Sequence, residues 1–178
     1  MATPPVFSVG ATLTAAQMNA VGLWLVKRQT VGTGVTSATV TGAFTSDFDD
    51  YQIVISGVAC SAGGLSMLIQ VGGGTANYYG SCYYDRYNAG NTGTIRTNNG
   101  SALYFGVTDT NSVSMALTVT QPSTSKITGF QGTFYGGDYS GWCGGTYAVA
   151  SAVTSFTLVA PGASNMTGGT ISVYGMRK

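Results

Sequence analysis

The stretch YQIVISGV at residues 51–58 decides the fold, because its apolar and polar residues alternate. Tyr51, Ile53 and Ile55 fall on one side of an extended chain, and the residues between them fall on the other. Residues 113–120 repeat this alternation. A period of two residues is typical of a β-strand with one face in the core, so both stretches are predicted to be strands.

The rest of the chain from residue 31 onward is also predicted to be β. Clusters of Gly, Asn, Asp and Pro separate the apolar runs, and no helical pattern lies between them. The connections are too short for the crossovers of a parallel sheet. We therefore expect a mainly β protein with an antiparallel, jelly-roll-like β-sandwich. The predicted strands are Val35–Phe44, Tyr51–Val58, Leu65–Val71, Tyr78–Tyr87, Ala102–Val107, Val113–Thr120, Ile127–Tyr135, Thr146–Ala150, Ser155–Val159 and Thr170–Gly175.

Residues 14–28 are the one segment predicted to be an α-helix. Thr14 and Gln17 form a T-x-x-Q capping box, and an apolar stripe follows at helical spacing. We expect this helix to attach the chain to a partner. The predicted domains are an N-terminal attachment segment, residues 1–30, and a β-sandwich domain, residues 31–178. The expected docking residues are Phe7, Leu13, Met18, Val21, Trp24 and Leu25.

The composition excludes most catalytic chemistry. The 178 residues include no His and no Glu, and all six acidic residues are Asp. Without His there is no Ser-His or Cys-His pair and no common metal ligand set. A polysaccharide depolymerase would have to take its carboxylate pair from these six Asp. We therefore expect no enzyme, no cofactor and no metal.

Charge and hydropathy narrow the range of partners. The net charge is +1 and the seven Lys and Arg are scattered, which argues against nucleic acid. No apolar stretch approaches the ~20 residues of a membrane span, so no membrane insertion is expected, and no signal peptide is recognisable. Only 7% of the residues are charged, against about 25% in ordinary soluble domains. Such a weakly charged surface favours a component of an assembly over a monomer.

The three cysteines, Cys60, Cys82 and Cys143, are too few for a disulfide scaffold. For a chain made in a reducing cytosol, we expect free thiols that pack as small apolar side chains. Pairing of Cys82 with Cys143 after release from the cell stays open.

Three segments resemble structural proteins of tailed bacteriophages. Residues 7–21, FSVGATLTAAQMNAV, look like an N-terminal segment common in those proteins: an aromatic residue, a Gly, then L-T-A-A-x-x-N. Residues 43–58 are similar to a strand-turn-strand segment of phage fibre and decoration-type proteins. The ending GGTISVYGMRK, residues 168–178, is similar to the terminal strand of the same proteins.

This resemblance implies an exterior virion structural protein of the tail-fibre-head or capsid-decoration type, made in the host cytoplasm. Such families commonly form homotrimers of β-sandwich heads, which an N-terminal segment attaches to capsid or tail proteins. Residues 60–165 have no counterpart in the resemblance. The host receptor and the choice between head and tail therefore stay open.

Asp47, Asp49 and Asp50 form the densest acidic cluster. Three carboxylates within four residues could hold Ca²⁺. Asp also suits the turn that leads into the strand at 51–58, where it hydrogen-bonds the local backbone. The turn is the favoured interpretation.

Tyrosines crowd residues 78–87. If the strand is regular, Tyr79, Tyr83 and Tyr87 share one face, and the residues between them face the other way. Exposed Tyr rings suit either contact between subunits or recognition of a glycan. Of these two, subunit contact is the favoured interpretation.

The Gly-rich stretch YGGDYSGWCGGTY at residues 135–147 contains Asp138, Tyr139 and Trp142. It is predicted to be either an exposed ligand-binding tip, where Asp138 orients sugar hydroxyls, or a tight hairpin whose Trp142 covers the end of the sandwich.

The leading hypothesis is a structural, non-catalytic exterior protein of a tailed-phage virion. Its N-terminal segment would attach to capsid or tail, and its sandwich would decorate the particle or adhere to the host surface, for instance through a glycan. The alternative is a free lectin-like carbohydrate-binding module.

Overall fold

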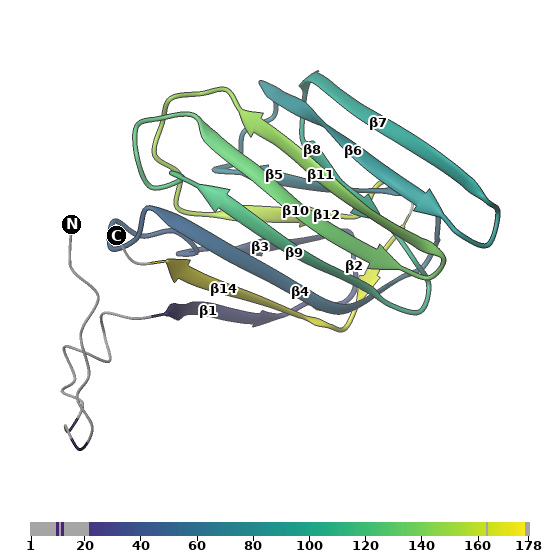
Figure 1. Cartoon of the computed structure of the whole chain (residues 1–178), viewed down its shortest axis with the longest axis horizontal. Coiled ribbons are helices and arrows are strands. Elements are labelled where there is room, and N and C mark those ends of the chain that lie inside the picture. The colour runs from purple at the N-terminus through teal and green to yellow at the C-terminus, as the bar shows by residue number, and fades with distance from the viewer. Residues whose placement is uncertain (1–9, 11, 13–21, 163, 177–178) are drawn as a thin grey trace.

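The computed structural model describes Gly10, Thr12 and residues 22–162 and 164–176. Over these residues the protein consists of two antiparallel β-sheets packed face to face, as Figure 1 shows. The predicted antiparallel β-sandwich is therefore confirmed.

The large sheet carries the candidate site and has the strand order β1-β14-β4-β9-β10-β11-β6-β7. Its strands, in this order, are Leu23–Thr30, Thr170–Met176, Asp50–Cys60, Val113–Thr120, Thr128–Gly136, Tyr139–Tyr147, Tyr78–Arg86 and Asn91–Gly100. Two short strands, β2 (Thr33–Val35) and β13 (Met166–Thr167), extend it beside β4. The small sheet has the order β3-β12-β5-β8, with strands Ser37–Val40, Phe156–Val159, Ser66–Val71 and Leu103–Val107.

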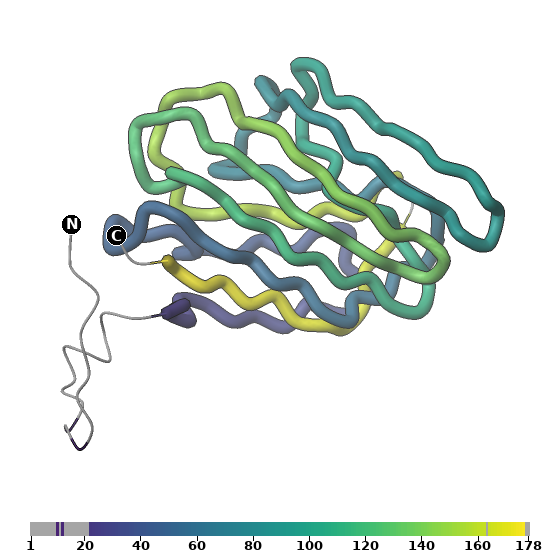
Figure 2. Tube along the Cα trace, in the orientation of Figure 1, coloured from purple at the N-terminus to yellow at the C-terminus, as the bar shows by residue number. Residues whose placement is uncertain are grey.

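Six strand pairs are nested one inside another along the chain. The outermost pairs are β1 with β14 and β2 with β13. Inside them lie β3 with β12, β4 with β9, β5 with β8, and the hairpin β6–β7. The hairpin β10–β11 is inserted between β9 and β6 in the large sheet. Figure 2 lets the reader follow this path as it crosses repeatedly between the two sheets.

The core lies between the sheets and follows the alternation read from the sequence. Tyr51, Ile53 and Ile55 of β4 are at most 1% exposed, and the alternate residues of β9 are buried beside them. Glycines in the large sheet let the small sheet approach closely. A Cβ atom on Gly80 of β6 would lie 2.6 Å from the Leu103 side chain of β8, closer than real Cβ atoms come.

The predicted helix is wrong where the structure describes it. Residues 23–28 belong to β1, which pairs antiparallel with β14 from Leu23 opposite Met176 to Thr30 opposite Thr170. Backbone pairing with a strand far along the chain overrides the weak local preference for helix. Gly22, at φ +108°, has a backbone conformation that excludes a continuous helix into β1.

Of the six expected docking residues, the structure describes two, both in β1. Leu25 is 56% exposed. Trp24 is half-buried, and its indole Nε1 has no hydrogen-bond partner among the described residues. The other four, together with residues 14–21 of the predicted helix, lie outside the described residues: Phe7, Leu13, Met18 and Val21.

Strand register places the two ends of the described chain together. Leu23 pairs with Met176 at one end of the large sheet. The turns at residues 87–90 and 137–138 lie at the opposite end, because Arg86 and Tyr139 pair there. Figure 1 shows β1 and β14 side by side and the turns after β6 and β10 at the far end.

Candidate functional site

Exposed aromatic side chains gather on the outer face, the side of the large sheet that faces away from the small sheet. Tyr83 of β6 and Trp142 of β11 are cross-strand partners and are 48% and 53% exposed. Their rings stack with centroids 5.3 Å apart and an interplanar angle of 13°. The sequence predicts that Tyr78 and Cys82 face away from Tyr83, and in the structure they lie in the core while Tyr83 lies outside.

A hollow of about 350 Å³ lies beside this stacked pair, and we call it the aromatic hollow. It combines aromatic rings with hydroxyl groups and one carboxylate, that of Asp85. The residues that line it are Tyr83, Tyr84, Asp85, Thr92, Ser140, Gly141 and Trp142. Flat apolar surface beside a few polar groups is the usual make-up of a small-molecule binding site.

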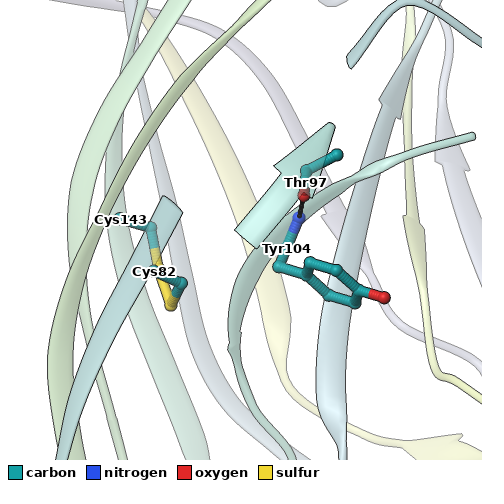
Figure 3. The surroundings of a disulfide bond; sticks show 4 residues. All are labelled: Cys82, Thr97, Tyr104 and Cys143. Carbon is teal, nitrogen blue, oxygen red and sulfur yellow. Dashed lines mark hydrogen bonds between the residues drawn. A yellow bond between two sulfur atoms is a disulfide. The ribbon is translucent and has the colours of Figure 1, made fainter. Parts of the chain in front are cut away.

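A disulfide bond lies directly behind the stacked pair. Cys82 and Cys143, the chain neighbours of Tyr83 and Trp142, are bonded to each other, with Cα atoms 4.0 Å apart and both side chains fully buried. Figure 3 shows the bond between Cys82 of β6 and Cys143 of β11. The two strands that carry the aromatic pair are thus covalently joined at the site. The expectation of free thiols is wrong for this pair.

A hydrogen bond between β7 and β8 lies near this disulfide, and the third cysteine is a free thiol in the core. Beyond the disulfide, the backbone N–H of Tyr104 donates to Oγ1 of Thr97 at 3.5 Å, which links β8 to β7 (Figure 3). The third cysteine, Cys60, is a buried free thiol, and burial raises its pKa. As the sequence predicts for all three, Cys60 packs as a small apolar side chain in the core.

The Gly-rich stretch 135–147 forms the tight hairpin that was one of its two expected structures, but Trp142 does not cover the end of the sandwich. It belongs to a regular hairpin in which β10 and β11 pair up to Gly136 opposite Tyr139. Gly137, at φ +56°, supplies the positive φ that a two-residue turn of type II′ needs at its first central position. Trp142 therefore lies mid-strand on the outer face, and not at a tip or over the sandwich end.

Asp138 ties two hairpins together instead of facing the hollow. Its carboxylate oxygen Oδ2 accepts a hydrogen bond from Nε of Arg86 at 2.8 Å, and this bond raises the pKa of Arg86. The backbone N–H of Tyr87 donates to the Asp138 carbonyl at 3.1 Å, and the Tyr87 hydroxyl donates to the Gly137 carbonyl. Asp138 thus fixes the β10–β11 turn against the end of β6.

Tyr139 and Tyr79 also lie outside the hollow. Tyr139 is half-buried on the inner side, where it makes an edge contact with Tyr84 at 5.8 Å, and the Arg86 guanidinium lies 5.2 Å from its ring centroid. Tyr79 is 39% exposed on the outer face, four residues before Tyr83 in β6. Of the expected contact residues, Tyr83 and Trp142 therefore form the site.

A second hollow, of about 330 Å³, lies on the same face over β4, β9 and β10. Sequence reasoning missed it, although its signal is present: Ser114 and Ala116 are small outward residues opposite larger ones on the neighbouring strands. Tyr135, which is 60% exposed, stands at its edge. Its other lining residues are Val54, Ile55, Ser56, Ser114, Met115, Ala116, Thr133 and Phe134.

The aspartates near the start of β4 make different contacts. The Asp47 carboxylate accepts from Oγ1 of Thr45 at 3.2 Å, a local bond that fits the turn interpretation. The Asp50 carboxylate, on the first residue of β4, accepts from the distant backbone N–H of Gln121 at 3.2 Å. Within residues 22–162 and 164–176, no three His, Cys, Asp or Glu side chains cluster in a way that could hold a metal ion.

In comparisons with known proteins, no protein-family model and no curated protein matches this sequence. The described part of the chain also has no helix of sufficient length and apolar character to cross a membrane.

Proposed function

We propose that this chain is a non-catalytic adhesion protein on the exterior of a tailed-phage virion. Its N-terminal segment attaches to capsid or tail proteins, its sandwich projects as part of a homotrimer, and its aromatic hollow binds a host-surface saccharide. One observation carries the saccharide assignment: Tyr83 and Trp142 stand exposed and stacked beside the aromatic hollow.

The chemistry of the hollow suits a sugar. A pyranose ring has an apolar C–H face, which packs on aromatic rings, and a rim of hydroxyl groups. The carboxylate of Asp85 and the hydroxyls of Thr92 and Ser140 line the same hollow and can accept or donate hydrogen bonds to that rim. The disulfide behind the pair holds both rings in place before the ligand arrives, which lowers the entropy lost on binding.

The strand order supports the same proposal. Its four inner nested antiparallel pairs, divided between two sheets, support the proposal of a jelly roll, an architecture found among viral capsid and lectin domains. The position of the site supports projection from a particle. Strand β1 starts at Leu23 beside Met176, whereas Asp85 and Ser140 lie one residue from the opposite end of their strands.

The test is saccharide binding by the purified full chain, first on an array of bacterial surface glycans and then by calorimetry. We expect Trp142→Ala to weaken binding of the best glycan by about 10- to 100-fold, because the ring supplies a central stacking surface. Tyr79→Ala is the matched control: it removes an exposed aromatic ring from the same face outside the hollow, and it should leave affinity unchanged.

Two outcomes would contradict the saccharide assignment. One is the absence of binding to any glycan by the wild-type chain. The other is an equal loss of affinity in the Tyr79 and Trp142 variants, with both variants still folded by circular dichroism, since that would remove the aromatic hollow as the cause.

A further inference from the structure

The two hollows of the outer face lie on the same rows of residues. One cross-strand row runs from Asp85 through Ser140 and Tyr135 to Ser114. The adjacent row runs through the following cross-strand partners: Tyr83, Trp142, Thr133, Ala116 and Val54. Both hollows are lined by residues of both rows, so they lie side by side across the strands.

The hollows also adjoin one another. The aromatic hollow ends on β11 at Ser140 and Trp142, and the second hollow begins on the neighbouring strand at Tyr135 and Thr133. The two hollows therefore follow one another across the outer face from β6 to β4, with the exposed rings of Trp142 and Tyr135 at their border. This distance is four strand spacings of about 4.8 Å, or about 19 Å, and a pyranose unit is about as long as one such spacing.

Charge restricts which ligands can fill the two hollows. Among the sixteen residues that line the two hollows, Asp85 is the one charged residue, and it is exposed. A lone carboxylate repels an anionic sugar. The other side chains that line the hollows are aromatic, aliphatic or hydroxyl-bearing. A neutral saccharide is not repelled by this carboxylate, and its C–H faces and hydroxyl groups suit the aromatic and hydroxyl side chains.

We propose that the outer face binds an extended neutral oligosaccharide of about four sugar units, which lies across the strands from β6 to β4. This inference rests on the proposed function and specifies its ligand. One sugar stacks beside Tyr83 and Trp142 in the aromatic hollow. The oligosaccharide then passes Tyr135, and the sugars at its other end fill the second hollow over Ser114 and Ala116.

The test measures affinity against chain length. The probes are ladders of one to six units of glucose, mannose, galactose and N-acetylglucosamine, together with ladders that contain glucuronic acid. For the neutral sugar that binds, we expect affinity to rise by about tenfold or more from one unit to four and then to level off. Glucuronic acid ladders should bind more weakly than neutral ladders of the same length.

Two variants of β9 locate the far end of the ligand. Ala116→Phe fills the second hollow and should reduce tetrasaccharide affinity to that of the disaccharide, with disaccharide affinity unchanged. Thr118→Phe is the matched control, since Thr118 lies on the same strand and face but outside both hollows, and it should change neither affinity.

The outcomes separate the two proposals. Monosaccharide binding that depends on Trp142 but does not increase with chain length would overturn the extended site and leave the proposed function standing. An equal effect of the Ala116 and Thr118 variants would also overturn it. The absence of binding by any saccharide overturns both.

Discussion

Tyr78 is the side chain whose acid–base chemistry folding changes most. It is fully buried, its hydroxyl oxygen accepts from the Val71 N–H at 2.7 Å, and burial raises its pKa to about 12. Folding favours the neutral phenol, so its contribution to stability is complete below the ordinary pKa of about 10 and is lost as the pH rises towards 12.

We therefore expect the free energy of unfolding to fall by up to about 3 kcal/mol from this group between pH 10 and 12. Urea unfolding at a series of pH values measures the change. Tyr78→Phe is the control, since it keeps the ring and cannot ionise. An equally steep fall in this variant over the same interval would assign the pH dependence to other groups.

The residues of the site show what sequence can and cannot predict at this scale. Alternation within β6 is local, and it correctly places Tyr83 on the same face as Tyr79. The stacking of Tyr83 on Trp142 depends on the register between β6 and β11, which are far apart in the chain. No local pattern specifies that register, so neither the aromatic pair nor the disulfide behind it could be predicted.

At the scale of elements, strands with strong alternation were predictable and two Gly-rich strands were not. β7 (Asn91–Gly100) and most of β11 (Tyr139–Tyr147) were expected to be turns and loop, because Gly and Asn usually mark such segments. In this sheet the glycines instead replace inward side chains. At Gly141, for example, a Cβ atom would lie only 2.8 Å from the Phe134 ring, so a larger residue would clash with that ring.

Gly132 in β10 gives the clearest test of this role. A Cβ atom there would collide with the Ala116 carbonyl oxygen and come within 2.9 Å of the Phe105 ring. We expect Gly132→Ala to lower the free energy of unfolding by about 1–3 kcal/mol, measured by urea denaturation. In the control Gly144→Ala on β11, the new atom would meet its nearest neighbour at 3.6 Å, so stability should be nearly unchanged. Equal losses in the two variants would rule out close packing as the cause.

At the scale of the whole molecule, the sandwich starts at β1, and this defines how the attachment segment can be tested. A deletion of residues 1–21 keeps every β1–β14 pair, whereas a deletion to residue 28 would remove most of them. We expect the shorter deletion to leave the melting temperature and saccharide affinity near those of the full chain. It should abolish incorporation into phage particles, which immunoblotting of purified particles measures.

Normal incorporation of the deleted chain would contradict attachment by the N-terminal segment. Failure of the full chain itself to join particles would instead favour a free lectin-like module. Sedimentation of the full chain adds an independent measurement, since the proposed homotrimer has three times the mass of one chain.

The nested strand pairs have a consequence for how fast and when this protein folds. Each outer pair joins segments from opposite parts of the chain, so forming it requires the closure of a long loop, and chains of this type fold in milliseconds to seconds. β1 is made early but pairs with β14, the last strand of the structure. Strand β1 therefore cannot join the large sheet until β14, which lies between β1 and β4, has left the ribosome. Until that moment β1 lacks its partner strand, and an unpaired strand is a site where incompletely folded chains aggregate.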